Sequence, residues 1–258
     1  MALIDTHSHL YHEDYTAEID AIILAAKQDG ISHIFLPNID VDTIEPMLLL
    51  ADKFPDYCIP LMGLHPTSVD ENYLSQLETI ENELTKRSYC GIGEIGIDLY
   101  WDKTHLIEQQ NAFRIQIQWA IDLQLPIVIH VRNSFRETME VLQEFDPKDL
   151  SGVFHSFCGT SDEAQEILKL DRFYLGINGI VTFKNSDLGN TLRAVPLDRI
   201  VLETDSPYLT PAPYRGKRNH PSYLKLIATK LSEVYELPIE NIYETTTNNA
   251  KSLFRNSF

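Results

Sequence analysis

Short apolar runs recur along the chain, and longer stretches of mixed polarity separate them. Each run is almost continuously apolar, which is typical of a strand buried on both faces of a parallel sheet. The pattern predicts eight strands, at Ala2–Asp5, His33–Pro37, Tyr57–Gly63, Cys90–Glu94, Ile127–His130, Gly152–His155, Phe173–Ile177 and Ile200–Asp205.

The stretches between these runs have apolar residues at helical spacing. The clearest examples are Thr16–Asp29 and Leu106–Leu123, which are predicted to be amphipathic helices. Gly30 and Pro126 follow these two stretches and are of the residue types that end helices. The alternation of strands and helices therefore predicts an α/β fold.

Eight strands with intervening helices predict a TIM-type (β/α)8 barrel, with an open doubly wound sheet as the alternative. The barrel is favoured because polar residues cluster at the carboxyl ends of many different strands, where barrel active sites are assembled. No linker composition, long charge block or internal repeat marks a boundary. We therefore expect one domain over residues 1–258.

Composition agrees with a globular domain and limits its partners. The 258 residues are 43% hydrophobic and 23% charged, which suits a chain with a large core. The formal net charge is −17, which argues against a protein that coats DNA through a broad basic face. Any contact with nucleic acid must then be local.

The first residues and the cysteines indicate the cellular compartment of the protein. The first residues have neither a basic region nor an apolar region of a signal peptide, and the longest uncharged apolar run, Ala21–Ala26, is too short to span a bilayer. Cys58, Cys90 and Cys158 have no paired spacing and are expected to be small buried groups. Unpaired thiols favour a cytoplasmic protein.

Histidines follow several of the predicted strands. His7 and His9 come directly after the first strand, and side chains two residues apart point to the same face of an extended chain. Alone, this pair fits a solvated loop equally well. His130 and His155 end the fifth and sixth predicted strands, each after an apolar run. Two such histidines at equivalent strand ends favour a shared site over isolated core histidines.

Two carboxylates are predicted to join these imidazoles. Glu94 ends the fourth predicted strand and Asp205 ends the eighth, where a buried carboxylate is costly unless it is paired or binds metal. Mixed imidazole and carboxylate groups suit borderline divalent metals. We expect two divalent ions, Mg, Mn or Zn: one held by His7, His9 and Asp205, the other by His130 and His155, with Glu94 bridging.

Six ordered fragments carry a resemblance to a known family. They are Asp5-Thr-His-Ser-His9, Gly63-Leu-His-Pro66, Gly93-Glu-Ile-Gly-Ile-Asp98, His130-x-Arg132, His155-Ser-Phe-Cys-Gly159 and Glu203-Thr-Asp-Ser-Pro-Tyr208. With these fragments and the segment Arg215–Asn219, the chain resembles the TatD-type deoxyribonucleases of the amidohydrolase superfamily. The resemblance covers nearly the whole chain.

The resemblance implies a divalent-metal nuclease, often a 3′→5′ exonuclease on DNA. It also implies that Glu94 stands where many superfamily members carry a carbamylated lysine. Two positions depart from the pattern: Cys158 replaces a common serine, and His220 replaces a common acidic residue. Neither is a proposed ligand, so the departures bear on substrate preference alone.

Further residues are candidates for substrate contact or support. His65 is placed to contact the scissile phosphate, or else is a turn histidine. Arg132 is placed to reach a phosphate or to orient Glu94, with a structural ion pair as the alternative. A basic loop, either a cationic mouth or a solvated charge run, holds three further substrate-binding candidates: Arg215, Lys217 and Arg218. Asp98 and Glu203 are expected to orient ligand imidazoles, with buried ion pairs to other basic groups as the alternative. Asp5 is expected either to do the same or to cap the end of its strand.

Together these features predict a metal-dependent nuclease that hydrolyses DNA phosphodiester bonds. The expected nucleophile is a hydroxide held between two ions, with Asp205 as general base and Glu94 and His65 as further catalytic residues. The expected partner is DNA, single-stranded or at a 3′ end, with RNA left open, and neither a membrane nor an obligate protein partner is expected. The alternatives are an ester or amide hydrolase, such as an aminoacyl-tRNA deacylase, and a non-catalytic binding scaffold.

Overall fold

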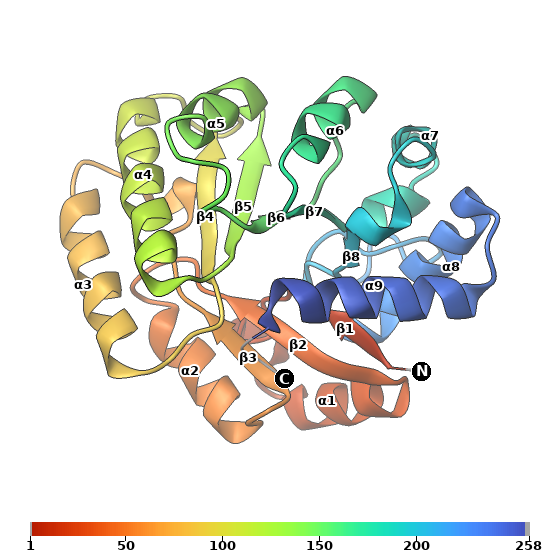
Figure 1. Ribbon diagram of the computed structural model, residues 1–258. Coiled ribbons are helices and arrows are strands. Elements are labelled where there is room, and N and C mark those ends of the chain that lie inside the picture. The colour runs from red at the N-terminus through yellow and green to blue at the C-terminus, as the bar shows by residue number, and fades with distance from the viewer. Residues whose placement is uncertain (1, 256–258) are drawn as a thin grey trace.

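The structure, a computed structural model, describes residues 2–255. Eight strands alternate with helices along this part of the chain (Figure 1). The strands are β1 (Leu3–Asp5), β2 (Ile31–Pro37), β3 (Cys58–Leu61), β4 (Ile92–Asp98), β5 (Ile127–Arg132), β6 (Gly152–Phe154), β7 (Phe173–Ile177) and β8 (Ile200–Leu202).

The strands pair in parallel and in chain order. β1 to β3 form one sheet and β4 to β8 form a second. Single parallel bridges cross both seams between them, Ser8 to Ser206 and Met62 to Ile92. The described strands show no reversal of order of the kind a doubly wound sheet has. The predicted TIM-type α/β fold is confirmed, with its sheet divided in two rather than one continuous ladder.

The helices lie outside the strands (Figure 1). They are α1 (Ile19–Gln28), α2 (Ile44–Lys53), α3 (Tyr73–Lys86), α4 (Leu106–Leu123), α5 (Phe135–Leu142), α6 (Ser161–Leu168), α7 (Leu188–Leu192), α8 (Leu224–Tyr235) and α9 (Ile239–Leu253). The prediction for α4 is confirmed at both ends. The first helix begins three residues later than predicted, because a 3-10 turn over Glu13–Tyr15 precedes it and ends at Thr16.

Five strands end at residues other than those predicted: β3 at Leu61, β4 at Asp98, β5 at Arg132, β6 at Phe154 and β8 at Leu202. His130 therefore lies inside β5 and His155 just after β6, and the differences in β4 and β8 concern carboxylates. β4 continues to Asp98, so Glu94 lies inside the strand. Its pairing with β5 shifts between Ile92 and Ile95, which gives β4 one extra residue and interrupts the alternation of faces there. β8 ends at Leu202, three residues before Asp205, whose N–H donates to the carbonyl of His7 across the seam.

A separate apolar cluster occupies the interior enclosed by the strands. Each strand from β1 to β8 except β4 and β7 supplies a buried residue to it, namely Ile4, Phe35, Leu61, Val128, Val153 and Val201. The end of α9 closes this interior, because Phe254, which follows the helix, stacks on Phe35 with ring centroids 4.2 Å apart. The interior is therefore a packed core, and polar side chains can gather only beyond its carboxyl end.

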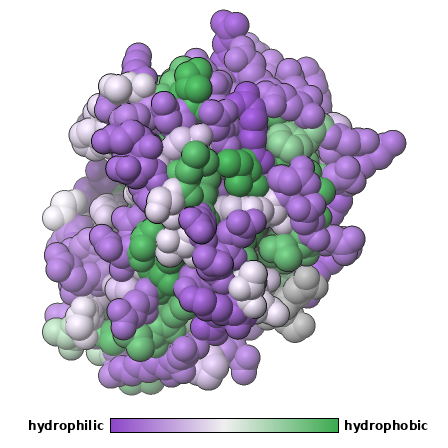
Figure 2. All heavy atoms as spheres, turned by 90° about the vertical axis from the view of Figure 1, so that its left-hand side faces the viewer, coloured by the Kyte–Doolittle hydropathy of each residue, from purple (hydrophilic) through white to green (hydrophobic). Residues whose placement is uncertain are grey.

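The outer surface is mostly hydrophilic. Figure 2 shows the side that carries α3 and α4, where hydrophobic side chains gather in patches between hydrophilic ones. Cys58 and Cys90 are buried as predicted, whereas Cys158 is exposed because it lies in the loop after β6. Across residues 2–255, each helix is too short or too polar to cross a bilayer.

Candidate metal centre

Alternation along the strands brings the predicted histidines above the interior core. Val128 of β5 belongs to the interior cluster, and His130 lies two residues further along the same strand. Val153 of β6 likewise precedes His155 by two residues. Because residues two apart share a face of a strand, both imidazoles point toward the carboxyl end of the interior.

Glu94 lies at the centre of the cluster. Its Oε2 is 3.2 Å from Nε2 of His7 and 3.7 Å from Nε2 of His9. Its Oε1 is 2.7 Å from Nδ1 of His130 and 3.7 Å from Nε2 of His155. The two oxygens of one carboxylate thus face two different pairs of imidazoles, which is the arrangement that a carboxylate shared by two cations would need.

Asp205 completes the cluster from the turn after β8. Its φ of 57° lies in the left-handed region, which non-glycine residues adopt infrequently and aspartate more readily than most. Its Oδ1 lies 3.6 Å from Nε2 of His9 and 3.8 Å from Nε2 of both His7 and His155. The turn therefore returns a carboxylate to three of the four predicted histidine ligands.

His65 lies closer to the ligand groups than a phosphate contact alone requires. Its Nε2 is 3.4 Å from Oε1 of Glu94 and 3.2 Å from Nδ1 of His130. These three residues are close enough to hold one cation together. A second such group is formed by His7, His9 and Glu94. His65 is thus a further candidate ligand, while its contact with a phosphate stays a prediction.

Two carboxylates outside the central cluster fix the orientation of the His130 and His155 rings. Oδ2 of Asp98 lies 2.9 Å from Nε2 of His130, and Oε1 of Glu203 lies 3.0 Å from Nδ1 of His155. Each ring therefore presents its other nitrogen to Glu94, as histidine ligands of metals usually do. Gly176 leaves room for this, because a Cβ there would lie 2.3 Å from the Glu203 carboxylate.

Asp5 takes the second of its two expected roles, at the end of its strand, and Tyr11 supports the cluster without having been predicted. Asp5 does not contact a ring; it accepts hydrogen bonds from the backbone N–H and hydroxyl of Thr204, at 2.8 and 2.6 Å, and so holds the residue before Asp205. Tyr11 was missed: its hydroxyl is 2.8 Å from Nδ1 of His9. The repeated two-residue spacing of His7, His9 and Tyr11 was the signal that could have indicated it.

The charge balance fits bound cations. Glu94, Asp98, Glu203 and Asp205 are all buried. Within residues 2–255, their ion-pair partners are histidines, and neither lysine nor arginine pairs with them. Buried carboxylates without a basic partner are costly, and divalent cations among imidazole and carboxylate groups would offset that cost.

Burial and neighbouring charges shift the acid–base properties of the cluster. Burial raises the pKa of Asp205 to about 7. Burial would lower the pKa of His155, but the carboxylates of Glu203 and Glu94 outweigh it and raise this pKa to about 10. His9 shows the opposite behaviour, because burial lowers its pKa to about 4. Without cations, His155 therefore holds a proton at neutral pH.

We expect metal uptake by the metal-free protein to release protons at pH 7. His155 must be neutral and Asp205 ionised to act as ligands, whereas at pH 7 before binding His155, with a pKa of about 10, is protonated and Asp205, with a pKa of about 7, is half protonated. Metal affinity should consequently rise with pH from 7 toward 9. Calorimetry in buffers of different ionisation enthalpy measures the release. Uptake without proton release would contradict the involvement of these two residues.

Comparison with known proteins places the chain in a family. Residues 4–255 match the family described as TatD related DNase. The chain belongs to the TatD family. A metal-dependent hydrolase of Bacillus subtilis named YabD, described as uncharacterized, is 36% identical over 98% of this chain and 99% of its own length. Another, YcfH of Escherichia coli K12, is 31% identical over 98% and 96%.

Solved structures agree with this placement. The TatD homologue YjjV of Escherichia coli K12 superposes with a TM-score of 0.91 at 27% identity, over 98% of both chains. A TatD family hydrolase of Entamoeba histolytica superposes with a TM-score of 0.84 at 22% identity, over 98% of both chains, which supports the fold alone. The resemblance seen in the sequence is thereby confirmed.

The predicted substrate contacts of this TatD family member lie at the exposed edge of the site. Arg132 is exposed, and within the described residues it neither pairs with a carboxylate nor touches Glu94. In the basic loop, the Arg215 guanidinium lies 3.8 Å from the Phe183 ring centroid. Arg218 instead pairs with Glu18, so its charge is already partly offset. Substrate binding by these residues stays a prediction.

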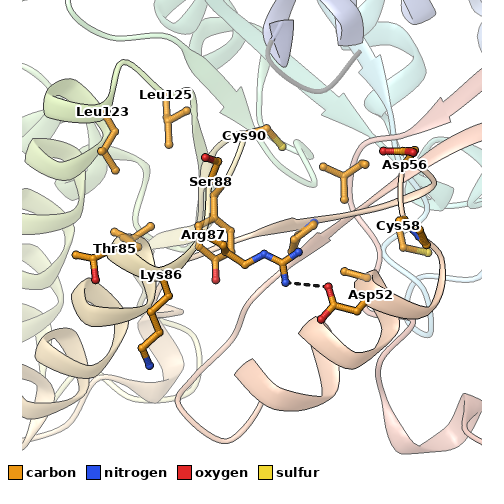
Figure 3. A pocket seen from close by; sticks show the side chains of 16 residues that line it. Asp52, Asp56, Cys58, Thr85, Lys86, Arg87, Ser88, Cys90, Leu123 and Leu125 are labelled. Atoms are coloured by element: carbon orange, nitrogen blue, oxygen red, sulfur yellow. Dashed lines mark ion pairs between the residues drawn. The ribbon is translucent and has the colours of Figure 1, made fainter.

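Two hollows lie at opposite ends of the strands. One reaches His155 and is lined by the loops after β5, β6 and β7, including Phe157, Cys158 and Phe183. The other, shown in Figure 3, lies at the amino ends of β3 and β4 and contains the Arg87–Asp52 ion pair, at 3.1 Å. The second hollow contains none of the predicted site residues, and that end of such a fold usually serves stability.

Proposed function

We propose that this TatD-type metal-dependent hydrolase cleaves phosphodiester bonds of DNA as a two-metal nuclease, removing nucleotides from a 3′ end. The observation that carries the proposal is Glu94, whose two oxygens face separate groups of imidazoles. Paired metal sites of this kind serve phosphatases, nucleases and polymerases. The description of the matched family, TatD related DNase, points to the same substrate class.

The ligand residues would divide between two ions. His7, His9 and Asp205 would hold one, His130 and His155 the other, and Glu94 would contact both. When bound, the ions would acidify a water molecule and offset charge on the phosphate oxygens. Metal analysis would show whether the two ions are Mg, Mn or Zn.

The chain itself supplies a base and an orienting group. Asp205 Oδ1 faces the imidazoles of His7, His9 and His155, and this carboxylate would accept the proton of the attacking water. His65 lies beside His130 at the edge of the cluster, where an imidazole can donate to a phosphate oxygen. Burial of the site excludes bulk water and strengthens both interactions.

An activity panel tests the proposal against its rivals. The metal-loaded protein is assayed on single-stranded DNA, RNA, aminoacyl-tRNA and an aryl ester. Release of nucleotides from a 3′-labelled DNA strand supports the nuclease. Hydrolysis of the aminoacyl ester alone would instead identify a deacylase, and inactivity on every substrate would favour a binding scaffold.

Free thiols support a cytoplasmic setting for this activity. Cys58, Cys90 and Cys158 are all unpaired, and such cysteines suit a reducing compartment. DNA in that compartment is the proposed partner, with RNA as a second substrate to be compared in the panel.

The basic loop should weaken DNA binding when its unpaired cations are removed. Arg215 and Lys217 are exposed and form no ion pair with a carboxylate within the described residues, so their charges are available to phosphates. The Arg215→Ala/Lys217→Ala variant should raise KM on an oligonucleotide, with metal content unchanged. Each lost phosphate contact should reduce the log–log salt slope by about 0.7 for a single strand.

Arg218→Ala is the matched comparison, because Arg218 already pairs with Glu18. It should change the salt slope less than the double variant does. An unchanged slope in Arg215→Ala/Lys217→Ala would mean that the loop is a solvated charge run.

A further inference from the structure

Three side chains form an exposed group beside the metal centre, which we name the stacking platform: Tyr100, Trp101 and Arg132. Trp101 is 71% exposed, the largest exposed fraction of any large hydrophobic side chain among the described residues, and Tyr100 is 53% exposed. Neighbouring exposed apolar side chains often mark a binding site. The platform therefore requires an explanation outside the packing of the core.

The three side chains are arranged around a guanidinium group. The Arg132 guanidinium carbon lies 3.9 Å from the Tyr100 ring centroid and 5.3 Å from that of Trp101. The two aromatic rings meet edge to face, with centroids 4.9 Å apart and planes at 89°. The platform thus offers aromatic faces and a planar cation in one place.

Backbone contacts fix the platform relative to the metal ligands. Oδ1 of Asp98 accepts hydrogen bonds from the backbone N–H groups of Tyr100 and Trp101, at 2.9 and 3.4 Å. Oδ2 of the same carboxylate lies 2.9 Å from His130. Arg132 pairs in register with Asp98 across β4 and β5. One side chain, Asp98, therefore positions both a ligand imidazole and the platform.

The charge of the platform is available to a ligand. Within residues 2–255, the Arg132 guanidinium has neither an ion-pair partner nor a side-chain hydrogen bond. It also lies near the hollow that reaches His155: burial raises the pKa of the Cys158 thiol there, and the charge of Arg132 opposes that effect. The platform therefore combines an available positive charge with exposed aromatic rings beside the candidate ligand His130.

We propose that the stacking platform binds an unpaired nucleobase of a single-stranded substrate, with Trp101 stacking on the base, Tyr100 meeting it edge-on and Arg132 contacting the adjoining phosphate. The inference rests on the proposed nuclease function and adds a requirement for accessible bases. Stacking on aromatic rings tolerates any base sequence. The platform thereby favours single strands or frayed ends over intact duplexes, whose bases stack on each other.

Fluorescence tests the stacking without relying on cleavage. The chain has two tryptophans, and Trp119, whose Nε1 donates to Glu81, can be replaced by phenylalanine to leave Trp101 as the sole reporter. Titration of the metal-free Trp119→Phe protein with oligothymidylate should quench Trp101. An abasic oligonucleotide of the same length should quench it much less. Equal quenching by both strands would overturn the proposal.

Steady-state kinetics provide the second test, with Trp119 left in place. Trp101→Ala should lower kcat/KM on a single-stranded oligonucleotide by about 5- to 100-fold, mainly through KM. The abasic strand should show no such loss, and Trp101→Phe should restore much of the activity. Arg132→Lys keeps the charge but loses the planar contact, and should fall between wild type and Trp101→Ala.

Ile107→Ala is the matched control, because Ile107 is 63% exposed on α4 and lies outside the platform. It should leave both strands unaffected. If Trp101→Ala lowers activity equally on both strands, the platform is structural and the proposal fails while the nuclease function stands. If the wild-type protein cleaves no phosphodiester yet Trp101 is quenched only by the base-bearing strand, the nuclease function fails and the stacking site stands.

Discussion

Replacing Glu94 by glutamine is expected to remove metal from both halves of the centre and to lower activity by about 1,000-fold or more. The substitution keeps the shape of the side chain but removes the charge that faces imidazoles on two sides. The NH2 group of the glutamine would also point its hydrogens toward the imidazole nitrogens on one side. Because both groups share this carboxylate, occupancy should fall at both together.

Elemental analysis of the purified Glu94→Gln protein measures this effect directly. His7→Ala should mainly affect the group on one side of Glu94, and the difference between the two variants distinguishes a shared ligand from a local one. Glu45→Gln, at an exposed position on α2, is the charge control. Metal content equal to wild type in Glu94→Gln would exclude the shared role.

Replacing Asp205 by asparagine should lower the activity and leave the fold intact. Loss of the proton acceptor is expected to lower kcat by about 100- to 10,000-fold. Asparagine tolerates the left-handed backbone of this position, whose φ is 57°, so the turn should be retained. Some metal should remain, since the histidines and Glu94 are intact.

The same variant should make the metal-free protein more stable at pH 8. Burial raises the pKa of Asp205 from 3.8 to about 7, so the folded state holds this proton more tightly than the unfolded state. Ionisation therefore destabilises the fold as pH rises from about 4 through 7, and asparagine removes that penalty. Thermal unfolding at pH 5 and pH 8 measures it, with exposed Asp198→Asn as control. A lower melting temperature at pH 8 would contradict the assignment.

The parts of this molecule that sequence could predict are those governed by short-range pattern. Continuous apolar runs indicated the strands, and helical spacing indicated α4 to the residue. His130 and His155 could be placed at the carboxyl end because a two-residue period relates them to Val128 and Val153.

The parts that sequence missed depend on pairing between distant segments. Nothing local to Glu94 shows that β4 carries an extra residue against β5, so its position inside the strand was not predicted. The role of Asp5 likewise depends on Thr204, which lies 199 positions away in the chain. The platform was missed for a similar reason, because Arg132 meets Tyr100 only after β4 and β5 pair.

The division of the sheet in two has a consequence for how this enzyme can be assembled. His7 and His9 follow the first strand of the smaller sheet, whereas Glu94 and His130 lie in strands of the larger one and His155 directly follows another of its strands. Neither half of the architecture contains a complete ligand set. Chemistry thus begins only once both halves have docked, so a partly folded or truncated chain would be catalytically silent, and full competence depends on completion of the whole fold.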